Sequence, residues 1–233
     1  MDKYQPVTHV IFDLDGLLLN TETLYFKLDS ALCAKHGGKF TTEIKRKIMG
    51  TTELRSAEII VEELKLPVTP QDYLSQLKQS AMEHITEVDV MPGVDELFQH
   101  LHENNIPFAI ATGSSYQIYL KKVQKHEKLF SLVDHITAAS SDPDVKNGKP
   151  APDVFLVCAD RFKDKPHPSK CLVFEDAPAG VTAAVSAGMQ VVMVPDEDYI
   201  TDDLKRDATV VLKSLKDFRP EWFGLPPYPE KKE

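Results

Sequence analysis

The sequence contains little cysteine, and the cysteines that it has follow no pairing pattern. There are three, Cys33, Cys158 and Cys171, and no two of them form a C-x-x-C pair. An odd number without metal-ligand spacing argues against a disulfide framework and against a structural zinc site. All three lie in apolar or helical patterns, so we expect buried, reduced thiols in a cytoplasmic protein.

The chain also lacks long apolar runs and an excess of positive charge. Its first residues have no apolar core of the kind found in signal peptides, and no segment approaches the length of a membrane span. The 27 Lys and Arg residues are outnumbered by 36 Asp and Glu residues, which gives a net charge of −9. We therefore expect neither nucleic acid nor a membrane as a partner, and a monomer is the default expectation.

What the sequence does have is an acidic turn directly after a short apolar run. In residues 8–16 (THVIFDLDG) the run leads into Asp13, Asp15 and Gly16. Such a run is typical of a parallel strand covered on both faces, whose carboxyl end opens into the crevice where α/β sheets bind ligands. Alternation along extended chain would direct both carboxylates the same way, which favours a shared cation such as Mg²⁺. The alternative is a solvated turn, because Asp and Gly are common in turns.

Two kinds of pattern follow this strand. Through residues 20–87 apolar residues recur at helical spacing with no strand between them, and Thr69 and Pro70 mark one helix start. From Met91 onward short apolar strands alternate with helices, and the helix after residue 115 carries Tyr116, Leu120 and Val123 at helical spacing. The expected strands are residues 107–111, 135–137, 171–174 and 190–194. The tail at residues 220–227 is rich in proline, so we expect it to pack as irregular chain.

These patterns predict an α/β fold with two domains. Residues 1–19 and 88–233 form a core with a parallel sheet and helices on both faces, because the first strand has no partner within the helical segment. Residues 20–87 form an inserted, all-helical domain directly after the acidic strand end. From that position it can act as a cap that excludes water from the site.

Polar residues follow several of the expected strands and can converge at one edge of the sheet. Besides Asp13 and Asp15 they are Thr112-Gly113-Ser114, Glu175-Asp176 and a lysine, Lys149, in a turn before a helix. An aspartate can attack phosphorus if Mg²⁺, a lysine and backbone amides offset the repulsion between the two anions. A second carboxylate can supply acid/base catalysis, and a threonine with a helix N-terminus can hold phosphate. Taken singly, such a threonine is usually a helix cap and such a lysine is usually solvated.

The order Asp13-Leu14-Asp15-Gly16, Thr112-Gly113-Ser114, Lys149-Pro150 and Glu175-Asp176 resembles the four motifs of the haloacid dehalogenase superfamily. A helical insertion after the first motif is similar to the cap of its phosphoglucomutase-like branch. The resemblance implies a Rossmann-like core, with Asp13 as nucleophile and Asp15 as acid/base. It places Thr112, Gly113 and Lys149 on the phosphate. It also implies Mg²⁺ held by Asp13, the Asp15 carbonyl and Asp176, with Glu175 on a metal-bound water.

Other segments narrow the expected substrate, a small phosphorylated molecule. Residues 6–9, 12–19, 171–178 and 223–226 are similar to a group of phosphatases in this branch that act on pseudouridine 5′-phosphate. The resemblance therefore implies a phosphatase for that nucleotide. The alternatives are a phosphatase for a sugar or polyol phosphate, such as 2-deoxyglucose 6-phosphate or glycerol phosphate, then a sugar phosphomutase or an inactive scaffold.

The sequence departs from the branch at three places. Asn20 stands where aspartate is common and Gly113 where serine is frequent, but neither change removes a proposed catalytic group. In residues 49–53 (MGTTE) the lysine and arginine that mutases carry near this glycine are missing. A mutase must hold the far phosphate of a bisphosphate, so this absence favours a phosphatase, unless these positions are ordinary helix surface.

Overall fold

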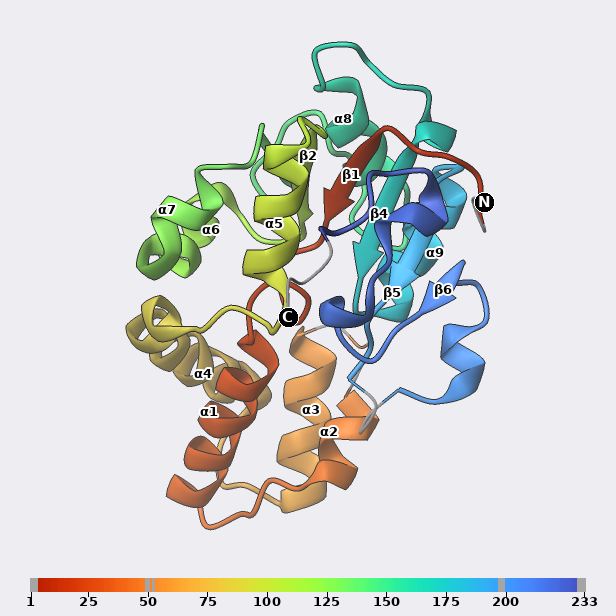
Figure 1. Cartoon of the computed structure of the whole chain (residues 1–233). Helices are drawn as coiled ribbons and strands as arrows, with labels where there is room; N and C mark the ends of the chain where they lie inside the picture. The colour runs from red at the N-terminus through yellow and green to blue at the C-terminus, as the bar shows by residue number, and fades with distance from the viewer. Residues whose placement is uncertain (1–3, 49–50, 52, 197–199, 230–233) are drawn as a thin grey trace.

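The computed structural model describes residues 4–48, 51, 53–196 and 200–229 of the chain. Within them, all strand pairs are parallel and form one sheet in the order β3-β2-β1-β4-β5-β6. Figure 1 shows this order from β2 to β6. The strands are β1 (His9–Phe12), β2 (Phe108–Thr112), β3 (Ile136–Ala138), β4 (Cys171–Glu175), β5 (Gln190–Met193) and β6 (Val210–Val211). The predicted α/β fold with a parallel sheet is confirmed. The sequence pattern missed β6, because two residues are too few to show a period.

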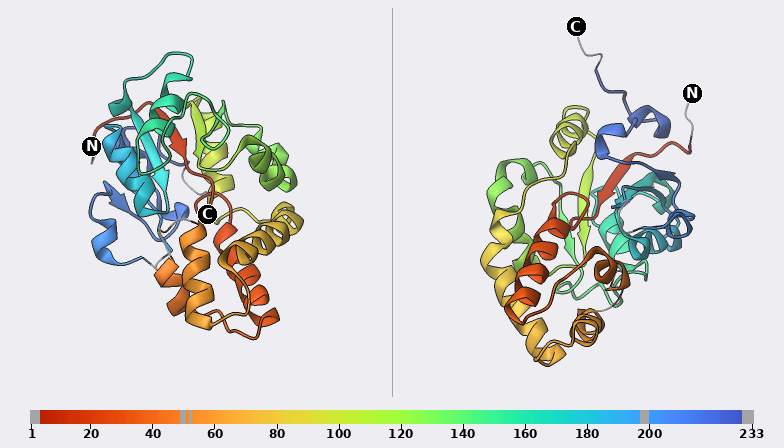
Figure 2. Two further views of the ribbon diagram at one scale, coloured as in Figure 1. Left: turned by 180° about the vertical axis from the view of Figure 1, so that it is seen from behind. Right: turned by 90° about the horizontal axis from the view of Figure 1, so that it is seen from below.

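Each face of the sheet has its own apolar core, because alternate residues of a strand point to opposite faces. On one face Phe12 and Phe174 pack in a cluster with α5 (Val94–Glu103). On the other face Ile11 and Val173 pack with α8 (Asp153–Asp160) and α9 (Pro178–Ser186). Helices on both faces are visible in Figures 1 and 2. Burial on both sides explains why the strands are continuous apolar runs rather than alternating ones.

In the described residues, four α-helices lie between β1 and α5 in the chain and gather at the carboxyl ends of the strands, below the sheet in Figure 1. They are α1 (Thr21–Lys35), α2 (Thr42–Ile48), α3 (Glu53–Leu64) and α4 (Pro70–His84). Buried residues such as Leu32, Ile60 and Tyr73 give them an apolar cluster of their own. In the described residues of this segment, the predicted run of helices without a strand is confirmed. The domain boundaries after residues 19 and 87 stay a prediction, and Met49, Gly50 and Thr52 lie outside the described residues.

The C-terminal tail is more regular than predicted. Pro220–Phe223 forms a short 3₁₀ helix where we expected irregular chain. The ring of Phe223 is fully buried and stacks on Tyr4 at a centroid distance of 4.9 Å. Packing of this aromatic side chain explains why a proline-rich segment takes up a helical turn, since proline is tolerated in the first turn.

Two predictions about absent features can be compared with the structure. All three cysteines are buried and have free thiols, as expected. No helix in the described parts of the chain is long and apolar enough to cross a membrane.

The strand order places a crevice at the centre of the sheet. Chain connections run outward in one direction from β1 through β2 to β3, and in the other direction from β4 to β6. Open α/β sheets bind ligands where the order reverses, outside the carboxyl ends of the strands. The residues that follow β1 and β4 therefore occupy the expected site.

Candidate active site

Asp13 is the first residue after β1 and lies at this reversal point. Its backbone N–H donates to the carbonyl of Phe174 on β4 at 3.0 Å, and its side chain is buried. Burial raises the pKa of Asp13 to about 7; Lys149 acts against this shift, whereas Glu175 and Asp15 add to it. A carboxylate here depends on positive partners to stay ionised.

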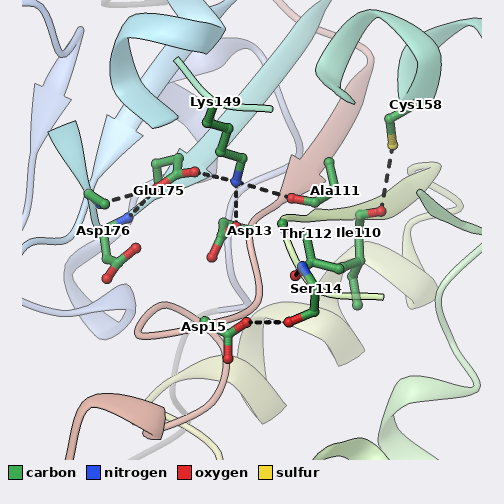
Figure 3. Close-up of polar contacts among 12 residues, drawn as sticks. Asp13, Asp15, Ile110, Ala111, Thr112, Ser114, Lys149, Cys158, Glu175 and Asp176 are labelled. Atoms are coloured by element: carbon green, nitrogen blue, oxygen red, sulfur yellow. Dashed lines mark hydrogen bonds and ion pairs between the residues drawn. The ribbon is translucent and has the colours of Figure 1, made fainter. Parts of the chain in front are cut away.

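Lys149 is the positive partner that reaches this carboxylate (Figure 3). Its ammonium group donates to Asp13, to Glu175 Oε1 at 2.6 Å and to the carbonyl of Ala111 at 3.3 Å. A lysine has three N–H donors, so all of them have acceptors. Burial alone would lower the pKa of Lys149, but the Asp13 and Glu175 carboxylates raise it overall. The lysine therefore stays protonated and links the ends of β1 and β4.

Asp13, Glu175 and Asp176 form an acidic cluster. One carboxylate oxygen from each lies within 4.8 Å of the others. Glu175 Oε2 accepts hydrogen bonds from the backbone N–H groups of Asp176 and Ala177, both at 3.1 Å, whereas no described residue donates to the Asp176 carboxylate. Burial, Glu175 and Asp13 raise the pKa of Asp176 well above its usual range.

The donor set of this cluster fits a hard divalent cation. The cluster has three carboxylates and one lysine, which pairs with Asp13 and Glu175, so negative charge is in excess, and all the side-chain ligands are oxygens. Both Glu175 oxygens already accept hydrogen bonds, whereas no donor among the described residues reaches the Asp176 carboxylate, which is therefore the better placed of the two to bind a cation. Asp13, Glu175 and Asp176 are therefore brought together. The roles of Asp13 and Asp176 as metal ligands, and of Glu175 on a metal-bound water, stay predictions.

Gly16 brings the loop after β1 against Asp176. A Cβ atom at this position would lie 2.1 Å from Asp176 Oδ2, and the backbone has a φ of +82°, which only glycine adopts readily. The turn is closed by a hydrogen bond from the Gly16 N–H to the Leu19 carbonyl at 2.9 Å. The backbone next to Asp15 therefore approaches the acidic cluster closely.

The Asp15 side chain does not join that cluster. Its oxygens accept hydrogen bonds from Lys122 Nζ at 2.5 and 2.7 Å and from the Ser114 hydroxyl at 3.2 Å. We expected Asp13 and Asp15 to point the same way. That expectation is wrong, because β1 ends at Phe12 and strand alternation does not extend to Asp15.

The end of β2 supplies the remaining predicted residues. Thr112 is fully buried, and its Oγ1 accepts a hydrogen bond from the Ser114 N–H at 3.1 Å. Ser115 caps the next helix, α6 (Tyr116–Val123). A Cβ on Gly113 would meet nothing within 4 Å, so no close contact requires glycine there. The structure brings Thr112 and Gly113 to the edge that holds Asp13, and their contact with phosphate stays a prediction.

Lys122 is the residue that the sequence analysis missed. The sequence analysis noted Tyr116, Leu120 and Val123 at helical spacing in α6. Tyr116 and Leu120 are each 49% exposed, and the buried side carries Tyr119, Lys122 and Val123. The spacing of apolar residues alone does not identify this buried side, because one of its members is a lysine. The signal in the sequence was a lysine at helical spacing between two packed residues, directly after Thr112-Gly113-Ser114.

A cavity of about 340 Å³ opens beside the acidic cluster. Gly16 and Asp176 line it together with Asn20 and Glu22 from the start of the helical segment, and with Met91 and Lys213 from the core. Glu22 accepts a hydrogen bond from Lys45 of α2 at 2.5 Å, and the Lys45 side chain is only 10% exposed. The helical segment therefore contributes polar groups to the surroundings of Asp176.

Comparison with known proteins agrees with this geometry. Residues 10–194 match the family model of haloacid dehalogenase-like hydrolases. The chain is 46% identical over 224 residues to a Drosophila melanogaster protein named "Probable pseudouridine-5′-phosphatase", covering 96% of each chain. It is also 46% identical over 227 residues to (DL)-glycerol-3-phosphatase 2 of Arabidopsis thaliana, covering 95% of this chain and 93% of the relative.

A solved structure shows the same likeness. A family hydrolase from Deinococcus radiodurans R1, solved with bound phosphate and sodium, has a TM-score of 0.80 and 26% identity, covering 96% of this chain and all of the other. β-Phosphoglucomutases are also among the similar folds, as the resemblance to that branch implies. The chain therefore belongs to the haloacid dehalogenase-like hydrolases and is an enzyme of their phosphatase type.

Proposed function

We propose that this enzyme is a magnesium-dependent phosphatase that hydrolyses a small phosphomonoester through an aspartyl-phosphate on Asp13. The observation that carries the proposal is the position of the Asp13 carboxylate, at the reversal point of the sheet and hydrogen-bonded to Lys149. A protonated lysine beside the nucleophile offsets the repulsion between a carboxylate and a phosphate dianion. Pseudouridine 5′-phosphate is the substrate that we propose first.

In the first step an Asp13 oxygen attacks phosphorus, and the bond between phosphorus and the leaving oxygen breaks. Thr112 and the backbone amides that follow it would hold the phosphate oxygens at the start of α6. Asp15, in its protonated form, donates a proton to the leaving alkoxide, which departs as an alcohol. Such proton transfer is typically worth about 10²–10⁴-fold in rate.

In the second step a water molecule attacks the phosphorus of the aspartyl-phosphate. Asp15, now a carboxylate, accepts the proton of that water, and the bond between phosphorus and Asp13 breaks. Inorganic phosphate and a free Asp13 carboxylate result. The same side chain thus acts as acid and then as base, which requires that it keep its position through both steps.

Mg²⁺ would be held by the Asp13 and Asp176 carboxylates and by the Asp15 carbonyl, with Glu175 next to it. When bound, Mg²⁺ supplies positive charge that stabilises the phosphoryl oxygens in the transition state. The excess of carboxylates over lysine in the acidic cluster and the absence of a donor to Asp176 among the described residues support this assignment.

Glycerol 3-phosphate is the second candidate substrate, because the glycerol-3-phosphatase relative is as similar to the chain as the pseudouridine-5′-phosphatase relative, at 46% identity. Asn20 and Glu22 in the cavity beside Asp176 offer hydrogen-bond partners for hydroxyl groups, which ribose and glycerol share. A volume of about 340 Å³ falls within the usual range for small-molecule pockets.

The test is phosphate release with Mg²⁺ from pseudouridine 5′-phosphate, uridine 5′-phosphate, glycerol 3-phosphate and 2-deoxyglucose 6-phosphate, compared as kcat/KM. Asp13→Asn is the matched control for contaminating phosphatases. We expect the highest kcat/KM for pseudouridine 5′-phosphate. A preference for glycerol 3-phosphate would keep the mechanism and replace the substrate. No release above the Asp13→Asn background from any of them would contradict the proposed function.

A further inference from the structure

Lys122 is a buried cation whose hydrogen bonds are all directed at one carboxylate and its neighbour. It lies on α6 and is 3% exposed. Its ammonium group donates to both oxygens of Asp15, at 2.5 and 2.7 Å, and to the Ser114 hydroxyl at 2.8 Å. The Ser114 hydroxyl in turn donates to Asp15 Oδ2 at 3.2 Å. The three N–H donors of the lysine are therefore fully used, and Asp15 is held from two sides.

Burial of the Lys122 ammonium group costs free energy of folding, so the presence of a lysine at this position needs an explanation. The Lys122 side chain is 3% exposed and loses its hydration, whereas the Asp15 side chain is 32% exposed, and an ion pair with a buried partner seldom adds net stability over well-packed apolar side chains. Tyr119 and Val123, on the same side of α6, belong to the apolar core. An apolar residue at position 122 would continue that packing, so the lysine is explained better by its partner than by the core.

The geometry also limits what Lys122 can do. At 3% exposure, with every donor already used, its ammonium group has no free N–H for a substrate. Lys149 shows the contrasting case, since it contacts the Asp13 nucleophile itself. Lys122 can therefore influence the reaction only through Asp15 and Ser114.

We propose that Lys122 is a positioning residue, which holds the Asp15 carboxyl group in place for proton exchange with the leaving oxygen and with water. This role rests on the proposed function, in which Asp15 is the acid/base group. A carboxyl group keeps an acceptor oxygen when it is protonated, so the lysine holds it in both steps. Ser114 supports the same orientation, because its hydroxyl bridges the two side chains.

The role predicts an effect that depends on the leaving group. An alkoxide needs a proton as it departs, whereas p-nitrophenolate is stable without one. kcat/KM reports the steps up to the first phosphoryl transfer, so the comparison isolates the acid step. Loss of positioning should therefore reduce kcat/KM for alkyl phosphates much more than kcat/KM for p-nitrophenyl phosphate.

The experiment compares Lys122→Met, Asp15→Asn and the double variant with the wild type, using pseudouridine 5′-phosphate, glycerol 3-phosphate and p-nitrophenyl phosphate. We expect Lys122→Met to lower kcat/KM for the alkyl phosphates about 10²-fold, and for p-nitrophenyl phosphate less than about 10-fold. Adding Lys122→Met to Asp15→Asn should change neither value by more than about threefold, because the lysine acts through Asp15.

The double variant also allows the role of Lys122 to be tested if Lys122→Met alone does not fold. Lys122→Met alone leaves the Asp15 carboxylate without its partner and can unfold the protein, whereas the double variant removes both charges. If only the double variant folds, its comparison with Asp15→Asn still decides the question: equal values support the role, and a further loss shows a function of Lys122 that is independent of Asp15. Ser114→Ala should give a smaller loss with the same preference for alkyl substrates.

Two other results would overturn the proposal. If Lys122→Met folds and loses activity equally on alkyl and aryl phosphates, or loses none, Lys122 does not position the acid. If the wild type itself releases phosphate from none of the substrates, the proposed function fails, and the positioning role fails with it. The first result leaves the phosphatase mechanism on Asp13 intact, so the two failures are distinguishable.

Discussion

Gly180 lies directly against the carboxyl group of Glu175. A Cβ atom at position 180 would be 1.8 Å from Glu175 Oε1 and 1.9 Å from its Cδ atom. Glu175 is 1% exposed, and its oxygens accept hydrogen bonds from Lys149 and from two backbone N–H groups. The first turn of α9 thus shapes the position of an acid in the candidate active site.

Gly180→Ala should therefore lower both stability and activity. On helix propensity alone this substitution would stabilise α9 by about 1 kcal/mol. The steric conflict acts in the opposite direction, since Glu175 cannot move without breaking its hydrogen bonds, and such overpacking costs about 1–3 kcal/mol. We expect a net loss in the free energy of unfolding, measured in urea, and at least about a 10-fold loss in phosphate release.

Gly148→Ala is the control for the general effect of adding a methyl group to glycine. A Cβ at position 148 would meet nothing within 4 Å. We expect its free energy of unfolding to stay within about 0.5 kcal/mol of the wild type. A Gly180→Ala protein as stable as the wild type would show that Glu175 is free to move.

Several of the residues that sequence reasoning found lie at the ends of apolar strands or just after them, whereas Lys149 was found in a turn before a helix. Asp13, Thr112 and Glu175 could be placed at one edge because parallel strands end on the same side of a sheet. The Asp15–Lys122 pair could not be found in this way, because its partners are 107 positions apart and the lysine lies within a helix. Helical spacing can place Lys122 on the same side of α6 as Tyr119 and Val123, but it does not identify Asp15 as its partner.

Asp13→Asn tests the nucleophile. Asparagine has the same shape and keeps an oxygen that can accept from Lys149, so we expect the fold to be retained by circular dichroism. Its amide group is a poor nucleophile, so phosphate release should fall at least about 10³-fold. Activity near the wild-type level would remove Asp13 from the mechanism.

The proposed dependence on Mg²⁺ predicts that a chelator will abolish phosphatase activity. We expect EDTA to abolish phosphate release, and Mg²⁺ but not Ca²⁺ to restore it, because Ca²⁺ takes longer bonds and more ligands than Mg²⁺. Phosphate release that is unaffected by EDTA would contradict the metal assignment.

Asp176→Asn tests binding of Mg²⁺ by a measurement of stability that does not depend on catalysis. Asp13, Glu175 and Asp176 repel one another when no cation is present, so this variant should melt at a higher temperature than the wild type in EDTA. Mg²⁺ should raise the melting temperature of the wild type but not that of the variant, because ligand binding stabilises only a protein that binds it. Equal Mg²⁺-dependent shifts would place the cation elsewhere.

The raised pKa of Asp29 in α1 predicts how pH affects the stability of the helical segment. Its Oδ1 accepts a hydrogen bond from the Tyr73 hydroxyl at 2.8 Å, and burial raises its pKa from 3.8 to about 6, although Tyr73 and Lys45 act against this. The folded state therefore binds a proton more tightly than the unfolded state does. The stability that this proton provides is complete below pH 3.8 and is lost as the pH rises through about 6.

Asp29→Asn should remove this pH dependence, because the amide is neutral and still offers an oxygen to Tyr73. A shift from 3.8 to about 6 corresponds to at most about 3 kcal/mol. We expect the variant to unfold at a higher urea concentration than the wild type at pH 7.5, and at a similar one near pH 4. Taking the difference between the two proteins cancels the titration of acids elsewhere in the chain. A variant less stable than the wild type at pH 7.5 would mean that the charged form of Asp29 supports the packing of α1 against α4, and that attraction to Lys45 outweighs the loss of hydration.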